Sequence, residues 1–227
     1  MLGGGAGTAV PASGSVRPVG PGSGGGQGSG HPSQPFSRHS NGLDQFFGTL
    51  RDRGTLSLLD FAGATQDNIS FITSMGHRLA SEDFSRSLEM TFGRDMLLQN
   101  QQEPTLVDQF VSENLLFERD SFDGVLLWDS LQLLSPHLLQ VTIDRLYESM
   151  RPESVALAFF NADEKAKQIP IYSWRLVDAN TVVVTLRGHH PAGQYFNNRT
   201  LEKMFHRFSS VKFFLARDHL REIIVRR

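Results

Sequence analysis

A strand–turn–helix–strand pattern early in the chain most constrains what this sequence can fold into. "TLSLLDFAG" (55–63) is a short apolar run ending in a glycine, which is typical of a strand buried on both faces. "DNISFITSMG" (67–76) carries apolar residues at helical spacing and also ends in glycine, and "HRLASEDF" (77–84) follows as a second strand. Two strands joined by one helix form the right-handed crossover unit of parallel sheets.

The alternation of strands and helices continues to the end of the chain. Residues 85–113 show helical spacing but no confident strand. A buried strand, a helix that begins with a Ser-Pro pair, another buried strand and a closing strand pair then follow: "FDGVLLWDSLQLL", "SPHLLQVTIDRLYESMRPE", "SVALAFFNA", "SVKFFLA" and "REIIVRR". We therefore predict an α/β fold, a mostly parallel twisted sheet with helices on both faces and an antiparallel C-terminal strand pair.

Composition divides the chain into a tail and one domain. Residues 1–42 are dominated by Gly, Ser and Pro and contain little apolar surface to bury, so we predict a disordered tail there. Its glycine clusters have no strand before them and no helix after them, which argues against a phosphate-binding loop. Residues 43–227 form the predicted α/β domain, with a hairpin insertion over 170–195.

Charge and cysteine content exclude several classes of function. The 227 residues contain no cysteine, which excludes disulfides, thiolate metal sites and cysteine nucleophiles, and we expect a reducing cytoplasm as the compartment. A net charge of −2 gives no strong signal for a nucleic-acid partner. No apolar run reaches the roughly 18 residues of a membrane helix, and the first residues do not form a secretory signal.

The order of the segments resembles the class I S-adenosylmethionine-dependent methyltransferase family. "LLDFAGAT" is similar to the first-strand motif of that family and "GHRLASEDFS" to its second strand with a terminal acid. "NLLFERDSFDGVLLWDSLQLLSP" resembles the stretch from the adenine-contacting loop through the fourth strand, and "LYESMRPESVALAFF" the segment that leads into the fifth. The resemblance covers about residues 43–227 and implies a Rossmann-like methyltransferase fold with S-adenosylmethionine as cofactor.

The resemblance also assigns cofactor-binding residues. Asp60 closes the first strand near the methionine part of the cofactor, and Glu82 or Asp83 binds the ribose. Asp60 and Asp83 stand close to the roughly 20-residue separation typical of such units. The other implied cofactor contacts are Ala62, Gly63 and Ala64 in the turn, Asn114 and Leu115 by the adenine, and Trp128 and Asp129 beside the methyl-transfer pocket.

The turn departs from the glycine pattern of the family. Ala62, Ala64 and Gln66 stand where the family has glycines, and a positive φ would strain these residues by about 1 kcal/mol or more each. A pyrophosphate needs still closer backbone approach, so the same residues argue against NAD. Two hypotheses follow: a methyltransferase that acts on a small-molecule or macromolecular substrate, favoured because Asp60 and Asp83 are retained, or a binding or regulatory module without tight cofactor binding.

Three residues are candidates for a catalytic group. Asp129 follows the fourth strand, His137 begins the next helix, and His190 lies in the hairpin insertion, where a general base would serve a nucleophile that must lose a proton. His189 and His190 are adjacent and point to opposite faces of an extended chain, so they do not chelate one metal easily. We predict no metal site, and methyl transfer by positioning requires no strict triad.

Overall fold

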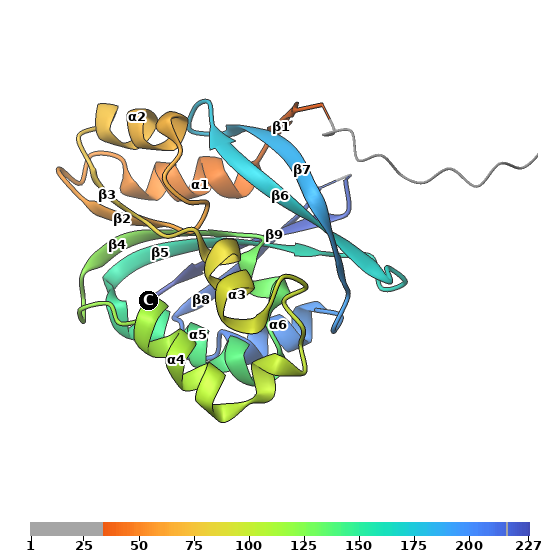
Figure 1. Cartoon of the computed structure of the whole chain (residues 1–227). Coiled ribbons are helices and arrows are strands. Elements are labelled where there is room, and N and C mark those ends of the chain that lie inside the picture. Colours follow the sequence, from red (N-terminus) through yellow and green to blue (C-terminus); the bar gives the residue numbers. More distant parts are fainter. Residues whose placement is uncertain (1–33, 217) are drawn as a thin grey trace, which may run out of the picture. The chain divides into compact units, whose positions relative to one another are not determined.

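The computed structural model describes residues 34–216 and 218–227, and all of them belong to the compact unit Pro32–Arg227. A six-stranded sheet forms its centre (Figure 1). The strand order is β3 (Arg78–Ser81), β2 (Ser57–Asp60), β4 (Phe122–Trp128), β5 (Met150–Asn161), β9 (Leu220–Arg226) and β8 (Ser210–Leu215). The first four strands are parallel, and β9 is antiparallel to both β5 and β8. This is the predicted α/β architecture, a mostly parallel sheet with an antiparallel C-terminal strand pair.

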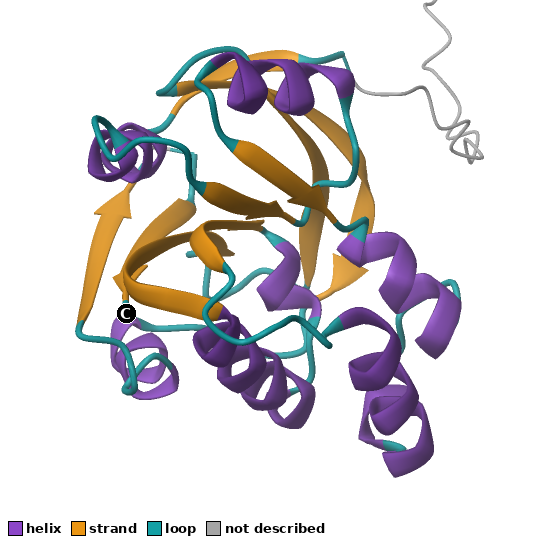
Figure 2. Ribbon diagram, turned by 90° about the vertical axis from the view of Figure 1, so that its left-hand side faces the viewer, coloured by secondary structure: helices purple, strands orange, loops and turns teal. Residues whose placement is uncertain are grey.

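Helices cover both faces of the sheet and define two hydrophobic cores (Figures 1 and 2). On one face α1 (Asn41–Leu50) buries the predicted stripe of Leu43, Phe46, Phe47 and Leu50, and α2 (Gln66–Ser74) lies beside it. The helices that contribute to the other core are α3 (Phe84–Phe92), α4 (Pro104–Asn114), α5 (Pro136–Ser149) and α6 (Asn198–Met204). The described residues also form two short 3-10 helices, η1 (Asn100–Gln102) and η2 (Ser130–Leu133).

Helix ends follow capping chemistry. Ser135 Oγ accepts a hydrogen bond from the Leu138 N–H at the start of α5, as expected of a Ser-Pro helix start. Thr65 does the same for α2 by accepting from the Asn68 N–H. Between β3 and β4 the chain forms α3, η1 and α4, so β3 is the edge strand of the sheet.

A second, three-stranded antiparallel sheet is built from the insertion and a segment far away in sequence. Its strands are β1 (Phe36–His39), β7 (Thr181–Pro191) and β6 (Gln168–Leu176), and β6 and β7 form the predicted hairpin. Ordered structure thus begins earlier than the expected boundary at residue 43, while residues 1–33 of the expected tail lie outside the described residues. The reason is long-range: β1 pairs through its backbone with β7, and buried Arg38 lies 2.7 Å from Glu222 on β9.

Candidate functional site

The carboxyl ends of β2 and β4 meet at Asp60, the acid that closes the first parallel strand. Its side chain is fully buried and accepts hydrogen bonds from Trp128 Nε1 at 2.6 Å, Asn68 Nδ2 at 2.7 Å and the Ala62 N–H at 2.9 Å. Burial raises the pKa of Asp60, and these three donors partly offset that effect. Every donor comes from the protein itself, so the carboxylate is already satisfied.

Asp129 repeats this arrangement one residue beyond the end of β4. It is buried, and it accepts hydrogen bonds from Trp174 Nε1 at 2.7 Å and from the Tyr172 N–H at 3.1 Å, both on β6. Burial raises the pKa of Asp129 to about 6, against the lowering effect of these two donors. The insertion hairpin is thereby bonded to the strand end on which the candidate site was expected.

The two tryptophans fill the space between these acids. Their rings stack with centroids 5.3 Å apart and planes 11° apart, and Phe159 packs against both. Trp128 has a φ of +51°, an uncommon conformation for a bulky residue, at a register shift between β4 and β5. The cavity left beside Asp129 has a volume of about 10 Å³. A single water needs roughly 10–15 Å³, so the described side chains leave room for about one water.

Asn68 connects this cluster to α2. Its Nδ2 donates to Asp60, and its Oδ1 accepts from the Leu176 N–H of β6 at 2.7 Å. The residue therefore joins helix, parallel strand and hairpin. The sequence analysis did not identify Asn68, Trp174 or Tyr172 as site residues. Trp174 and Tyr172 reach Asp129 from a distant part of the chain. Asn68 lies only eight residues after Asp60, but a polar residue in the first turn of a helix carries no signal that its side chain is buried.

The turn after β2 needs only one glycine. Gly63 has a φ of +81°, and neither Ala62 nor Ala64 nor Gln66 is among the residues with positive φ. The expected strain at these three positions is therefore not incurred. A Cβ on Gly63 would lie 3.3 Å from Asp83 Cβ, and Ala62 forms an isolated bridge with Asp83, so the turn packs directly on the end of β3.

The other predicted cofactor residues lie in an open groove beside α3. Glu82, Asp83 and Asn114 line this groove, which has a volume of about 360 Å³. Asp83 Oδ1 caps α3 by accepting from the Arg86 N–H at 3.1 Å, and Asn114 Nδ2 donates to the Phe110 carbonyl at 3.0 Å. Glu82 has its pKa raised by partial burial. We call this space the α3 groove; the lining residues are Glu82, Asp83, Arg86, Ser87, Met90, Thr91, Glu113 and Asn114. Leu115 does not join them, because it is buried in the core.

Neither candidate histidine lines the space beside Asp129. His137 is exposed in the first turn of α5. His190 is buried, with Nδ1 2.8 Å from the Pro191 carbonyl oxygen and Nε2 3.1 Å from that of Asp95, so its ring holds loop backbone in place. His189 is exposed on β7. Within residues 34–216 and 218–227, no group of three His, Asp or Glu side chains is placed to hold a metal ion.

No helix in the described part of the chain is both long and apolar enough to cross a membrane.

The remaining catalytic candidate, Asp129, accepts hydrogen bonds from two donors of the hairpin. Among the sequence-predicted residues, the structure thus brings Asp60, Trp128 and Asp129 into one filled cluster, and Glu82, Asp83 and Asn114 into an open groove beside it. Asp83 lines both the groove and the small space beside Asp129.

Comparison with known proteins gives similarity in structure alone. No protein-family model and no curated protein matches the sequence. Among solved structures, 1,6-didemethyltoxoflavin-N1-methyltransferase from Burkholderia thailandensis, with bound S-adenosylhomocysteine, is 13% identical over 82% of this chain and 76% of its own, at a TM-score of 0.46. A SAM-dependent methyltransferase from Methanosarcina mazei is 12% identical over 77% of this chain and 93% of its own, at a TM-score of 0.43. A TehB-like SAM-dependent methyltransferase from Corynebacterium glutamicum is 11% identical over 82% of this chain and 87% of its own, at a TM-score of 0.42.

Proposed function

We propose that this protein is a methyltransferase-fold binding module that does not hold S-adenosylmethionine at the ends of its parallel strands. The observation that carries the proposal is the filled cluster, in which each tryptophan indole donates to a buried aspartate. The remaining volume of about 10 Å³ contrasts with the roughly 300–1,000 Å³ of small-molecule sites. The space beside Asp129 therefore does not fit the methionine half of the cofactor.

Opening the cluster has a physical cost. Moving Trp128 out of the site would remove the N–H that it donates to Asp60, and moving the hairpin would remove the corresponding bond to Asp129. A buried carboxylate that loses a hydrogen-bond donor costs about 1–3 kcal/mol or more. A ligand would have to supply this free energy as well as its own binding free energy, which lowers its apparent affinity.

A second candidate is S-adenosylmethionine-dependent methyl transfer to an unidentified small molecule or macromolecule. It is favoured by the α3 groove, where Glu82, Asp83 and Asn114 face one open volume at the place the resemblance assigns to the adenosine. This function requires the hairpin to move so that the methionine half becomes accessible.

Calorimetric titration separates the two. We expect no binding heat when S-adenosylmethionine or S-adenosylhomocysteine is added at about 1 mM. Trp174→Ala tests whether the filled cluster excludes the cofactor, because it removes one of the two stacked rings and should expose space beside Asp129. Its folded state is checked by near-ultraviolet circular dichroism.

Tight binding to the unmodified protein would overturn the proposal. A dissociation constant below about 100 μM, lost in Asp83→Ser, would support the second candidate instead. Serine retains the ability to cap α3 but is too short to reach a ribose, so it removes the ligand contact without removing the cap. Glu113→Gln, which changes another acid that lines the same groove, is the matched control.

A further inference from the structure

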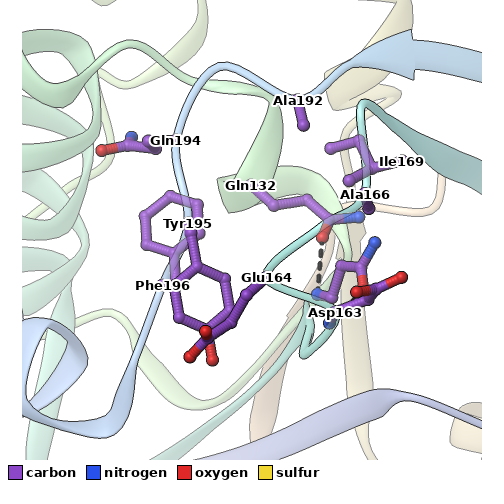
Figure 3. A pocket seen from close by; sticks show the side chains of 10 residues that line it. Gln132, Asp163, Glu164, Ala166, Ile169, Ala192, Gln194, Tyr195 and Phe196 are labelled. Atoms are coloured by element: carbon purple, nitrogen blue, oxygen red, sulfur yellow. Dashed lines mark hydrogen bonds between the residues drawn. The ribbon is translucent and has the colours of Figure 1, made fainter.

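A separate cavity lies at the carboxyl end of β5, away from the filled cluster. Its volume is about 150 Å³, and it is enclosed by η2, the loop that follows β5 and the segment that follows β7 (Figure 3). We call it the Gln132 cavity; the lining residues are Gln132, Asn161, Asp163, Glu164, Ala166, Ile169, Ala192, Gln194, Tyr195 and Phe196. None of them lines the space beside Asp129 or the α3 groove.

Gln132 presents an unused donor to this cavity. The side chain is only 4% exposed, and its Oε1 accepts a hydrogen bond from the Asn161 N–H at 2.8 Å. Its Nε2 is buried and has no hydrogen-bond partner among the described residues. Figure 3 shows the side chain reaching from η2 into the middle of the lining residues. A buried amide N–H without a partner is unfavourable, so the site is built to receive an acceptor oxygen.

The charge of the lining is negative. Asp163 and Glu164 are exposed carboxylates at the rim, and the lining contains no Lys, Arg or His. The loop that carries both carboxylates is held by hydrogen bonds from backbone N–H groups to side-chain oxygens: Asn161 Oδ1 accepts from the Asp163 N–H, and Asp163 Oδ1 accepts from the Lys165 N–H. Lys165 and Lys167 of the same loop are exposed and do not line the cavity. Arg221 donates to the carbonyl of Phe196, so that guanidinium is already paired with backbone. The side chains that line the cavity therefore favour a cation.

Apolar and aromatic side chains complete the cavity. Tyr195 and Phe196 lie on one side and Ile169 on another (Figure 3). Phe196 is anchored by its contact with Phe160, with ring centroids 4.9 Å apart. An aromatic face attracts a nearby ammonium group, so the rings and the rim carboxylates both favour a positively charged ligand.

We propose that the Gln132 cavity binds a small organic amine that also carries a hydroxyl or carbonyl oxygen. The oxygen accepts from Gln132 Nε2, and the ammonium group lies between the rim carboxylates and the ring of Tyr195. The volume of about 150 Å³ exceeds the roughly 10–15 Å³ of one water and falls below the roughly 300 Å³ at which sites for drug-sized ligands begin. The ligand thus has only a few heavy atoms. This site does not depend on whether the protein binds S-adenosylmethionine.

The side-chain amide of Gln132 reports on the site directly in a ¹H–¹⁵N correlation spectrum of the full chain. Ethanolamine is the probe, because it combines an ammonium group with one hydroxyl. We expect saturable shifts of the Gln132 amide signal with a dissociation constant in roughly the millimolar range, since four heavy atoms make few contacts. The signal is assigned by its loss in Gln132→Met.

Charge and donor are tested separately by variants. Asp163→Asn combined with Glu164→Gln neutralises the rim and retains an acceptor at Asp163, and we expect ethanolamine to bind about fivefold more weakly. Glu202→Gln, an exposed carboxylate on α6 that does not line the cavity, is the matched control and should leave binding unchanged. Ethylene glycol and glycolate lack the ammonium group and should bind more weakly than ethanolamine.

Three results would overturn the proposal. The first is an unchanged Gln132 amide signal with about 50 mM ethanolamine, which would mean that water alone occupies the cavity. The second is equal or tighter binding of glycolate, which would reverse the ligand charge. The third is unchanged ethanolamine binding in the rim-neutralised variant. Because all the measurements are made on folded protein without S-adenosylmethionine, they succeed or fail independently of the proposed function.

Discussion

The filled cluster and the α3 groove are neighbouring regions with acidic residues at strand ends, yet the carboxylates are buried in one and border an open volume in the other. In the filled cluster, Asp60 and Asp129 are buried and each accepts a hydrogen bond from an indole. In the α3 groove, Glu82 and Asp83 border an open volume of about 360 Å³. The difference teaches that an acid at the expected place in the chain does not define a ligand site; the partners that the rest of the fold supplies decide whether it remains available.

The largest expected effect comes from emptying the filled cluster. Trp128→Ala removes a fully buried ring and a donor to Asp60, so we expect the free energy of unfolding to fall by about 3–5 kcal/mol. Met90→Ala in the α3 groove, where the side chain is 76% exposed, should change it by less than about 0.5 kcal/mol. Urea denaturation measures both. Similar losses for the two variants would remove the distinction between the regions.

The pH dependence of stability sharpens the comparison for Asp129. Its pKa is about 6 in the folded protein against a usual value of 3.8. Folding therefore favours the protonated acid, and the stabilisation is fully present below about pH 4 and is lost as the pH rises through about 6. Asp129→Asn resembles the protonated form. The unfolding free energy of the variant relative to wild type should rise by up to about 3 kcal/mol between about pH 4 and pH 7. Denaturation curves across that range check the sign, and a constant or falling difference contradicts it.

Asn68 tests whether the hairpin is held on the filled cluster by hydrogen bonds. Asn68→Ala removes the donor to Asp60 and the acceptor for the Leu176 N–H, both buried. We expect a loss of about 2 kcal/mol, together with faster amide exchange at Leu176. Gln66→Ala changes an exposed contact within the same helix and is the control. Unchanged exchange at Leu176 would show that packing alone holds the hairpin.

The smallest effect is expected in the α3 groove. Asp83→Ala removes the N-cap of α3 and should reduce stability by about 1 kcal/mol. Asp83→Asn retains the cap and should be nearly neutral, because asparagine caps helices as well as aspartate does. Thermal unfolding compares the two variants. An equal loss in both would mean that the charge of Asp83, rather than its capping bond, supports this region.

The sequence predicted the elements whose signals are local. The β2–α2–β3 unit follows from an apolar run, helical spacing and a second strand within about 30 residues, as expected of such crossover units. β1 could not be predicted in the same way, because "FSRH" lacks an alternating apolar pattern and its pairing partner, β7, is remote in sequence. The predicted domain boundary at residue 43 was late for the same reason.

The position of the candidate site in the sheet could be predicted from the sequence, but the side chains that fill it could not. The positions of Asp60 and Asp129 at strand ends follow from the order of strands. That Trp174 would donate to Asp129 depends on how the hairpin docks, and a single sequence carries no signal for that contact. The sequence also could not show which positions of the glycine-poor turn need a positive φ. Ala62 and Ala64 avoid positive φ because Gly63 alone makes the bend.

The pairing of β1 with β7 has a consequence for how the domain is assembled. Phe36 faces Val184 across this ladder, so an early segment of the chain can pair only after a late segment has formed. Contacts between distant residues carry a loop-closure cost and slow folding. During synthesis the ribosome releases the segment of β1 well before that of β7, so β1 stays unpaired until most of the central sheet has left the exit tunnel. The strand that was hardest to recognise in the sequence is thus expected to be among the last to settle.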